Sequence, residues 1–318
     1  MIFSEAYLNQ LADSTGFPLD SLEKQMHLLH ILREIRRHPY LQDQFALKGG
    51  TAINVYLQSL PRLSVDIDLN YIGAEAVETM RKERPRIEQA LNRLLEAEGY
   101  TVKRIPEEHA GGKWRLSAPS AFGETFTLEL DNNYLYRVPL GAVQYQTPAT
   151  PDEEYAVPFP LVSTNELYAG KILALLDRGA TRDLYDVYWA IKNEFLMPDS
   201  PLKPILLFLG LAQRSDWRAV SPDIIEGISR RQIEIELDPM LNREDTFPLE
   251  EAKSTVQPFL SKLLQYSSAE KTCITQFLDH GEFQPEMVVD DPVLLDQLRN
   301  HPVIQWKLLN IRKHLGLE

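Results

Sequence analysis

The sequence predicts an α+β fold, in which a mixed sheet flanked by helices is followed by a helical domain. Strand-like and helix-like periods alternate in the first half of the chain, residues 148–160 form a proline-rich connector, and nearly every segment after Ser163 has a helical period. The length of 318 residues is enough for about two domains. We therefore predict domains at residues 1–160 and 161–318.

The first elements follow from periodicity and from glycine and proline positions. Residues 21–37 have a helical period, and residues 45–47 form a short buried strand that ends at Gly49-Gly50. Thr51 is expected to cap the next helix, which Pro61 ends. Residues 63–71 alternate between apolar and polar side chains, which predicts a strand.

A further helix and three strands complete the predicted first domain. Apolar residues from Ile87 to Leu95 recur at i, i+3 and i+4, and Gly99 follows as a helix end. The predicted strands cover residues 100–105, 113–118 and 124–131, with a turn at Gly111-Gly112 between the first two.

Composition restricts the class of protein. The content of 44% hydrophobic and 25% charged residues is that of a soluble globular protein, and one cysteine, Cys273, allows neither an internal disulfide nor a multi-cysteine zinc site. The N-terminus has no basic start or long apolar core, and the apolar run 205–212 is too short to span a bilayer. We expect a cytoplasmic protein without a membrane partner. The close pair His27 and His30 lacks an acidic ligand pattern, so a zinc hydrolase is poorly supported.

The net charge of −13 argues against a dedicated duplex-DNA binder. Any contact with nucleic acid has to be a local patch. The candidates are the arginines of "LREIRRHPY" (Arg33, Arg36, Arg37) and the run at residues 81–86, although arginine-rich helix faces are usually just solvated.

Two features of "FALKGGTAINVYLQSLPRLSVDIDLNYIG" indicate a site. Gly49, Gly50 and Thr51 lie at a strand-to-helix junction, where backbone N–H groups can receive a phosphate. Asp66 and Asp68 are two apart on a strand, so their carboxylates leave the same face and suit Mg²⁺ or Mn²⁺. A solvated edge strand is the plain alternative.

A third carboxylate would support the metal site. In residues 125–131, Glu129 and Asp131 share one face of the predicted strand. We prefer Glu129 as the third ligand because it lies mid-strand, whereas Asp131-Asn132-Asn133 resembles turn chemistry. The choice between the two stays open, and Glu129 as a solvent-facing strand residue is the alternative.

A second constellation lies in "STNELYAGKILALLDRGATRDLYDVYWAI". Ser163 or Thr164 caps a helix that Gly179 ends, and Lys171 on that helix has apolar neighbours. Its ammonium either reaches solvent along the apolar surface or serves a phosphate site. Arg182 and Asp186, at i and i+4 of the next helix, could be a simple ion pair.

These motifs together resemble the AbiEii/AbiGii nucleotidyltransferase toxins, including the MenT-like group, of the polymerase-beta-like superfamily. The resemblance covers nearly the whole chain and rests on residues 48–52 (KGGTA), residues 60–69 (LPRLSVDIDL), Glu166, Lys171, residues 177–179 (DRG), residues 182–186 (RDLYD) and the late segment HPVIQWKLLNI. It implies a nucleotidyltransferase core in the first domain. One departure is the threonine of Gly-Gly-Thr where many superfamily members have serine; both carry a hydroxyl.

The resemblance also implies roles for individual residues. Catalysis would involve Asp66, Asp68, Lys171 and Asp186, and Asp66 with Asp68 matches the metal-binding pair of the family. The strand pattern, not the resemblance, adds Glu129 as the third metal ligand. Nucleotide binding would involve a larger set: Gly49, Gly50, Thr51, Ser64, Lys171, Arg182 and Asp183.

The implied reaction transfers NMP from an NTP to an acceptor, as in some family members to the 3′ end of tRNA, with an antitoxin as a partner protein. Two other interpretations remain open. One is a nucleotide-binding module without turnover; the other is an NTP-dependent kinase or an enzyme that nucleotidylates protein.

Overall fold

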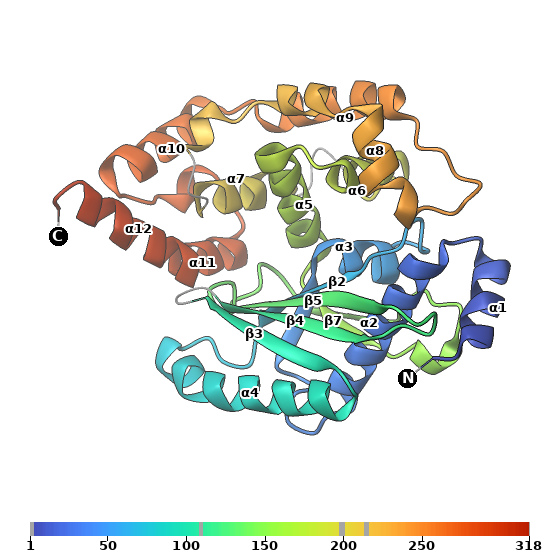
Figure 1. Ribbon diagram of the computed structural model, residues 1–318. Coiled ribbons are helices and arrows are strands. Elements are labelled where there is room, and N and C mark those ends of the chain that lie inside the picture. Colours follow the sequence, from blue (N-terminus) through green and yellow to red (C-terminus); the bar gives the residue numbers. More distant parts are fainter. Residues whose placement is uncertain (1–2, 108–110, 197–200, 213–215, 318) are drawn as a thin grey trace. The chain divides into compact units, whose positions relative to one another are not determined.

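The computed structural model describes residues 3–107, 111–196, 201–212 and 216–317 (Figure 1). The chain divides into two compact units. The first consists of Met1–Arg137, Val143–Val162 and Glu234–Thr246, and the second of Val138–Ala142, Ser163–Ile233 and Phe247–Glu318. The main division, at residue 162, lies near the predicted boundary at residue 160. The return of residues 234–246 to the first unit has no counterpart in the predicted division.

In the described part of the first unit, seven strands form one mixed sheet in the order β3-β4-β5-β2-β1-β7-β6. The predicted α+β fold is therefore confirmed. The central strands are β1 (Phe45–Lys48), β2 (Asp66–Tyr71) and β5 (Thr125–Asn133), where β2 is antiparallel to β1 and parallel to β5. The outer strands are β3 (Thr101–Glu107), β4 (Gly111–Pro119), β6 (Gln144–Gln146) and β7 (Phe159–Leu161).

One face of β3, β4 and β5 is buried by helices. Trp114, Leu116, Leu128 and Leu130 on this face are at most 1% exposed. Helix α4 (Val77–Ala97) covers it, and Asn92 on α4 accepts a hydrogen bond from Trp114 Nε1 at 2.6 Å. The alternating residues of the same strands leave the opposite face, which carries the polar side chains.

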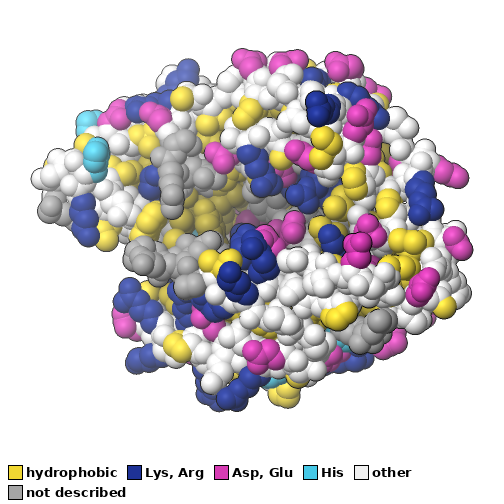
Figure 2. Space-filling view, in the orientation of Figure 1, with side chains coloured by type: hydrophobic (Ala, Val, Ile, Leu, Met, Phe, Trp, Pro, Cys, Tyr) yellow, Lys and Arg dark blue, Asp and Glu magenta, His cyan; other side chains and the backbone are white. Residues whose placement is uncertain are grey.

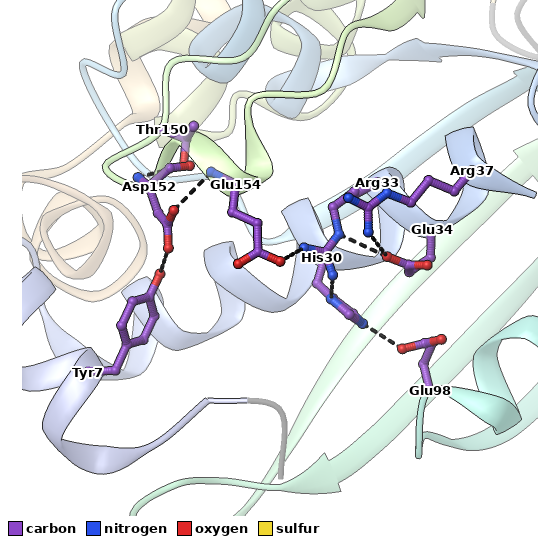
Figure 3. A network of polar contacts seen from close by, with 9 residues as sticks. All are labelled: Tyr7, His30, Arg33, Glu34, Arg37, Glu98, Thr150, Asp152 and Glu154. Atoms are coloured by element: carbon purple, nitrogen blue, oxygen red, sulfur yellow. Dashed lines mark hydrogen bonds and ion pairs between the residues drawn. The ribbon is translucent and has the colours of Figure 1, made fainter.

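The helices α1 (Glu5–Thr15) and α2 (Leu19–Arg37) are joined to the segment before β7 by a polar network (Figure 3). Tyr7 Oη donates to Asp152 at 2.5 Å, and the buried Arg33 donates to Glu154 at 2.5 Å. His30 Nε2 lies 2.8 Å from Glu98 Oε2, and His30 Nδ1 lies 3.0 Å from Arg33 Nη2. The proline-rich connector thus belongs to the first unit and contains η2 (Glu153–Tyr155) and β7.

The arginines proposed from sequence as nucleic-acid patches make contacts inside the first unit. Arg36 pairs with Asp43 at 3.0 Å and Arg37 with Glu34 at 3.3 Å. In the second run, Arg84 pairs with Glu88 at 2.9 Å. These acidic partners reduce the positive charge that the two segments could offer to a polyanion.

Several predicted boundaries are corrected. The helix begins at Gly49 as α3 (Gly49–Thr51) and continues as the π-helical segment η1 (Ala52–Leu57). Thr51 therefore lies inside the helix and does not cap it. The helix ends at Leu57, before Pro61. Strand β2 begins at Asp66 because the N–H of Leu63 donates to Met240 and that of Ser64 to Gln25. Gly111-Gly112 opens β4, and residues 108–110 lie outside the described residues. Helix α4 starts at Val77, well before Ile87.

The second unit is helical, as predicted. Its helices up to the return segment are α5 (Thr164–Arg178), α6 (Thr181–Lys192) and α7 (Leu202–Ala212), with short 3₁₀ turns at Trp217–Ala219 and Pro222–Gly227. Helix α8 (Arg230–Glu236) leads the chain into the segment that belongs to the first unit, which includes a turn at Asp238–Met240. The last elements are α9 (Leu249–Leu263), α10 (Ser268–His280), a turn at Pro285–Met287, α11 (Pro292–Asn300) and α12 (Pro302–His314).

Helix α5 packs against α7, and α6 against α9. Gly210 on α7 leaves room for the indole of Trp217, since a Cβ at this glycine would lie 2.3 Å from the ring. Among the described residues, no helix is both long and apolar enough to cross a membrane.

Candidate active site

Gly49 lies where only glycine is tolerated. Its φ of +72° is in the left-handed region, and a Cβ at this position would lie 2.2 Å from Oδ2 of Asp68. Lys48, just before it, is the register partner of Asp68 in the β1–β2 pair. The glycine therefore lets the start of the helix come directly against the carboxylate of Asp68.

Gly50 lies beside a buried cation. A Cβ on Gly50 would lie 3.0 Å from Arg62 Nη2 and 3.2 Å from Ser64 Oγ. Arg62 is 2% exposed and donates through Nη1 to the carbonyl of Leu63 at 2.7 Å. Arg62 lies within the family motif at residues 60–69, but no role is predicted for it from sequence. Nothing in its local sequence predicts that its guanidinium is buried next to the glycine turn.

Thr51 and Ser64 connect this turn to β2. The Thr51 hydroxyl donates to the backbone carbonyl of Asp66 at 2.6 Å and lies 2.9 Å from Ser64 Oγ. The N–H of Ser64 donates to Gln25 on α2 at 2.8 Å. Both hydroxyls are buried and hold the turn against the strand. Their contact with a nucleotide stays a prediction, and Gln25 is a supporting residue that sequence reasoning missed.

Four carboxylates share the open face of the sheet. In the parallel pair of β2 and β5, Asp66 lies beside Glu129 and Asp68 beside Asp131. Ile67, Leu69 and Leu130, which alternate with these acids, are buried at 0–1% exposure. Side chains on adjacent strands at paired positions point the same way, so the acids of both strands lie on one face.

The two candidates for a third carboxylate differ in their partners. Both oxygens of Glu129 accept hydrogen bonds, from Lys113 at 2.9 Å and Arg115 at 3.1 Å, and these cations lower its pKa. The pKa of Asp131 is raised, by burial first and then by the negative charge of Asp68, against the opposing effect of Lys113. The surroundings therefore favour Asp131, although the sequence favoured Glu129.

The residues present fit a divalent ion bound jointly with substrate phosphates. In the part of the chain that the structure describes, no group of three or more His, Cys, Asp or Glu side chains is arranged to hold a metal by itself. Burial, and after it the charge of Asp68, raises the pKa of Asp131, and the contribution of Asp68 is a like-charge repulsion that a bound cation relieves. Mg²⁺ keeps ligand positions for phosphate oxygens, so two or three carboxylates suffice.

The first test concerns Gly49→Ala. We expect loss of transfer activity together with a destabilisation of about 1–3 kcal/mol, because alanine combines the strained backbone with a clash at the Asp68 carboxylate. The control is Gly99→Ala, where φ is +87° but nothing lies within 4 Å of the added Cβ. Urea unfolding and activity assays of both variants measure the difference. Equal behaviour of the two variants would contradict the close approach of Gly49 to Asp68.

The second constellation is a buried ion cluster in the second unit. Lys171 on α5 is 8% exposed, and its Nζ lies 2.8 Å from Asp183 Oδ1 and 2.9 Å from Asp186 Oδ2. Both aspartates are 0% exposed on α6, and Arg178 pairs with Asp183 at 2.8 Å. The ammonium thus lies between two carboxylates, which excludes the solvent-reaching alternative. Arg182 is partly exposed on the same helix.

This cluster predicts acid sensitivity. Burial raises the pKa of Asp183, but Lys171 and Arg178 more than offset it, and the net pKa lies below the usual 3.8. A carboxyl whose folded pKa is lowered stabilises the fold above its unfolded pKa, and that stabilisation is lost as the pH falls through the folded value. We expect Asp183→Asn to be less stable than wild type at pH 7 and to lose less stability between pH 7 and 3.

The matched control is Asp216→Asn, since Asp216 pairs with Arg218 on the surface, where both side chains are more than 40% exposed. Water screens that pair, so its removal should change acid sensitivity little. Urea unfolding at pH 7, 4 and 3 provides the comparison. An equal effect of the two substitutions would contradict the special role of the buried cluster.

With the geometry of both clusters defined, comparison with known proteins identifies the family. The sequence profile described as "Nucleotidyl transferase AbiEii toxin, Type IV TA system" matches residues 30–279. The chain belongs to the AbiEii nucleotidyltransferase toxin family. As an AbiEii member it is a nucleotidyltransferase, and the matched range includes the glycine turn, the β2 aspartates and the Lys171 cluster.

A solved structure agrees with this assignment at the level of fold. MenT4, a nucleotidyltransferase toxin from Mycobacterium tuberculosis H37Rv, is similar with a TM-score of 0.63 at 15% identity, covering 97% of this chain and 99% of that chain. The search of curated proteins gives no match.

Proposed function

We propose that this AbiEii protein transfers the NMP group of an NTP to a hydroxyl of an RNA acceptor, with the 3′ end of tRNA as the first candidate. The observation that supports this most is the direct approach of Gly49 to Asp68. It puts a helix N-terminus, suited to phosphate, beside two carboxylates suited to metal. The motifs of the family supply the same assignment from sequence.

The reaction forms a bond between the acceptor oxygen and the α-phosphorus and breaks the bond from that phosphorus to the bridging oxygen of pyrophosphate. The backbone N–H groups at Gly49 and Gly50, with the buried Arg62 beside them, would orient the phosphates. Asp66 and Asp68, with Asp131, would hold Mg²⁺ or Mn²⁺, which when bound stabilises charge on the phosphate oxygens. The acceptor hydroxyl, with its pKa lowered beside the bound cation, would release its proton to solvent.

The deciding experiment incubates the protein with Mg²⁺, total RNA and each α-³²P NTP, and in parallel reactions with each γ-³²P NTP, followed by a denaturing gel. We expect label on a tRNA-sized band. Label on protein would point to a protein acceptor, and label transferred only from γ-³²P NTP would point to a kinase. Absence of any transfer would favour the nucleotide-binding module. Chelation of divalent ions with EDTA should abolish the transfer and excess Mg²⁺ should restore it.

The third carboxylate has a test of its own. We expect Asp131→Asn to lower kcat by about 10²-fold or more, because it removes a charge beside Asp68. Glu129→Gln should retain most activity, since its carboxylate pairs with Lys113 and Arg115. Both substitutions replace a carboxylate with its amide, and both lie on β5, so their kcat values can be compared directly. The reverse order of effects would restore Glu129 as the ligand.

The AbiEii description places the family in type IV toxin–antitoxin systems. A cognate antitoxin is therefore the partner that we propose, beside the NTP and the RNA acceptor. Co-expression with the adjacent gene, followed by a growth assay with the wild type and Asp68→Asn, tests both the toxicity and its neutralisation.

A further inference from the structure

The open face of the sheet continues from acidic to basic side chains. Beyond the carboxylates of β2 and β5, strand β4 presents Lys113 opposite Asp131 and Arg115 opposite Glu129. On the next strand, β3, Lys103 lies opposite Arg115. Opposite positions on antiparallel strands point to the same side, so these cations share the face of the catalytic carboxylates.

These three cations are accessible to a ligand. Lys103 is exposed, and the side chains of Lys113 and Arg115 are 30% and 50% exposed. The alternating residues Trp114 and Leu116 are buried under the other face, which fixes the direction of the basic side chains. Glu129 pairs with two of the cations, and Asp131 lies 3.4 Å from Lys113 Nζ. Among the described side chains, Glu129 is the carboxylate that still pairs with these cations when the aspartates hold a metal.

Lys103, Lys113 and Arg115 together form a basic strip. The strand order indicates which of the two reactants, the NTP or the acceptor, lies beside this basic strip. In an in-line displacement the attacking oxygen and the departing pyrophosphate lie on opposite sides of the α-phosphorus. Gly49 and Gly50 follow β1, on one side of β2, whereas β5, β4 and β3 lie on the other side. With the NTP phosphates at the glycine turn, the acceptor therefore approaches from the side of β4 and β3.

We propose that Lys103, Lys113 and Arg115 bind the phosphodiester backbone of the acceptor strand and guide its 3′ hydroxyl to the carboxylates. This inference rests on the proposed function. A local basic strip is needed because the chain has a net charge of −13. On the face visible in Figure 2, basic side chains are mixed with acidic ones, as expected for a protein that contacts RNA only locally. Positions two apart on a strand are separated by about 7 Å, which suits successive phosphates.

The test measures RNA binding separately from turnover. A single-stranded oligoribonucleotide of about 12 nucleotides, labelled at its 5′ end, is titrated with protein at several salt concentrations and followed by fluorescence anisotropy. We expect Lys103→Ala and Arg115→Ala each to weaken binding about threefold to tenfold at low salt. Each should also lower the slope of log affinity against log salt by about 0.7, the value for one phosphate contact on a single strand.

Lys82→Ala is the matched control, because Lys82 is equally exposed but lies on α4, which covers the other face. It should bind RNA as wild type does, and NTP affinity should be unchanged in all three variants. Arg115→Ala leaves Glu129 with Lys113 as its remaining partner, and thermal unfolding of this variant checks that the fold is still stable.

Three outcomes would overturn the proposal for the basic strip. They are absence of RNA binding by the wild type, equal slopes of log RNA affinity against log salt in all variants, and loss of NTP affinity in place of RNA affinity. Failure of the proposed function is distinguishable from these. If no α-phosphate label is transferred to any acceptor while the RNA slopes change as expected, the transfer reaction fails and the RNA-binding strip stands.

Discussion

Asp68→Asn should reduce nucleotidyl transfer at least about 10³-fold, because it removes a carboxylate that we propose as a metal ligand, and loss of such a ligand weakens stabilisation of the transferring phosphate by several kcal/mol. The substitution keeps the size of the side chain beside Gly49, so the turn should not move. Stability should be unchanged or slightly higher, since the repulsion between Asp68 and Asp131 is removed. Single-turnover assays and urea unfolding measure the two effects.

Asp66→Asn is expected to behave in the same way, because its backbone carbonyl, which accepts from Thr51, is not altered. Asp13→Asn, at an exposed acid of α1, is the control for a simple change of charge. Turnover close to wild type in the Asp68 or Asp66 variant would refute the metal assignment.

Lys171→Met should cost about 3–5 kcal/mol of the free energy of unfolding, because it leaves the buried Asp183 and Asp186 without the ammonium that lies between them. The control is Lys192→Met. Lys192 forms a pair of the same length, 2.9 Å, with Glu251, but both side chains are about half exposed. Water screens this pair, so its removal should change the free energy of unfolding little.

A stability effect of this size would hide any role of Lys171 in nucleotide binding, so a rescue variant is needed. Lys171→Met combined with Asp183→Asn and Asp186→Asn removes the buried negative charges and should recover most of the lost stability. If the KM for NTP stays raised in the refolded triple variant, Lys171 contributes to nucleotide binding as the family resemblance implies. Recovery of KM and kcat along with stability would assign it a structural role only.

The sequence by itself determined the local features of the fold and of the site. Period-2 alternation in β2 and β5 places Asp66 with Asp68 and Glu129 with Asp131 on common faces, and strand geometry enforces this wherever the strand goes. The glycine pair at positions 49 and 50 marked the junction of a strand and a helix, whereas the left-handed φ of +72° at Gly49 is seen only in the structure. The helix of Lys171 could be bounded from its own residues, with Ser163 and Gly179 at its two ends.

Only the tertiary structure decided which partner each of these groups has. The return of residues 234–246 to the first unit shortens β2, since Met240 takes the N–H of Leu63. Lys113 and Arg115 pair with Glu129, which changes the preferred third carboxylate to Asp131, and burial of Lys171 between two aspartates makes it part of the core. Such outcomes depend on pairing and desolvation between residues far apart in the chain, whereas periodicity reports only the face on which a side chain lies.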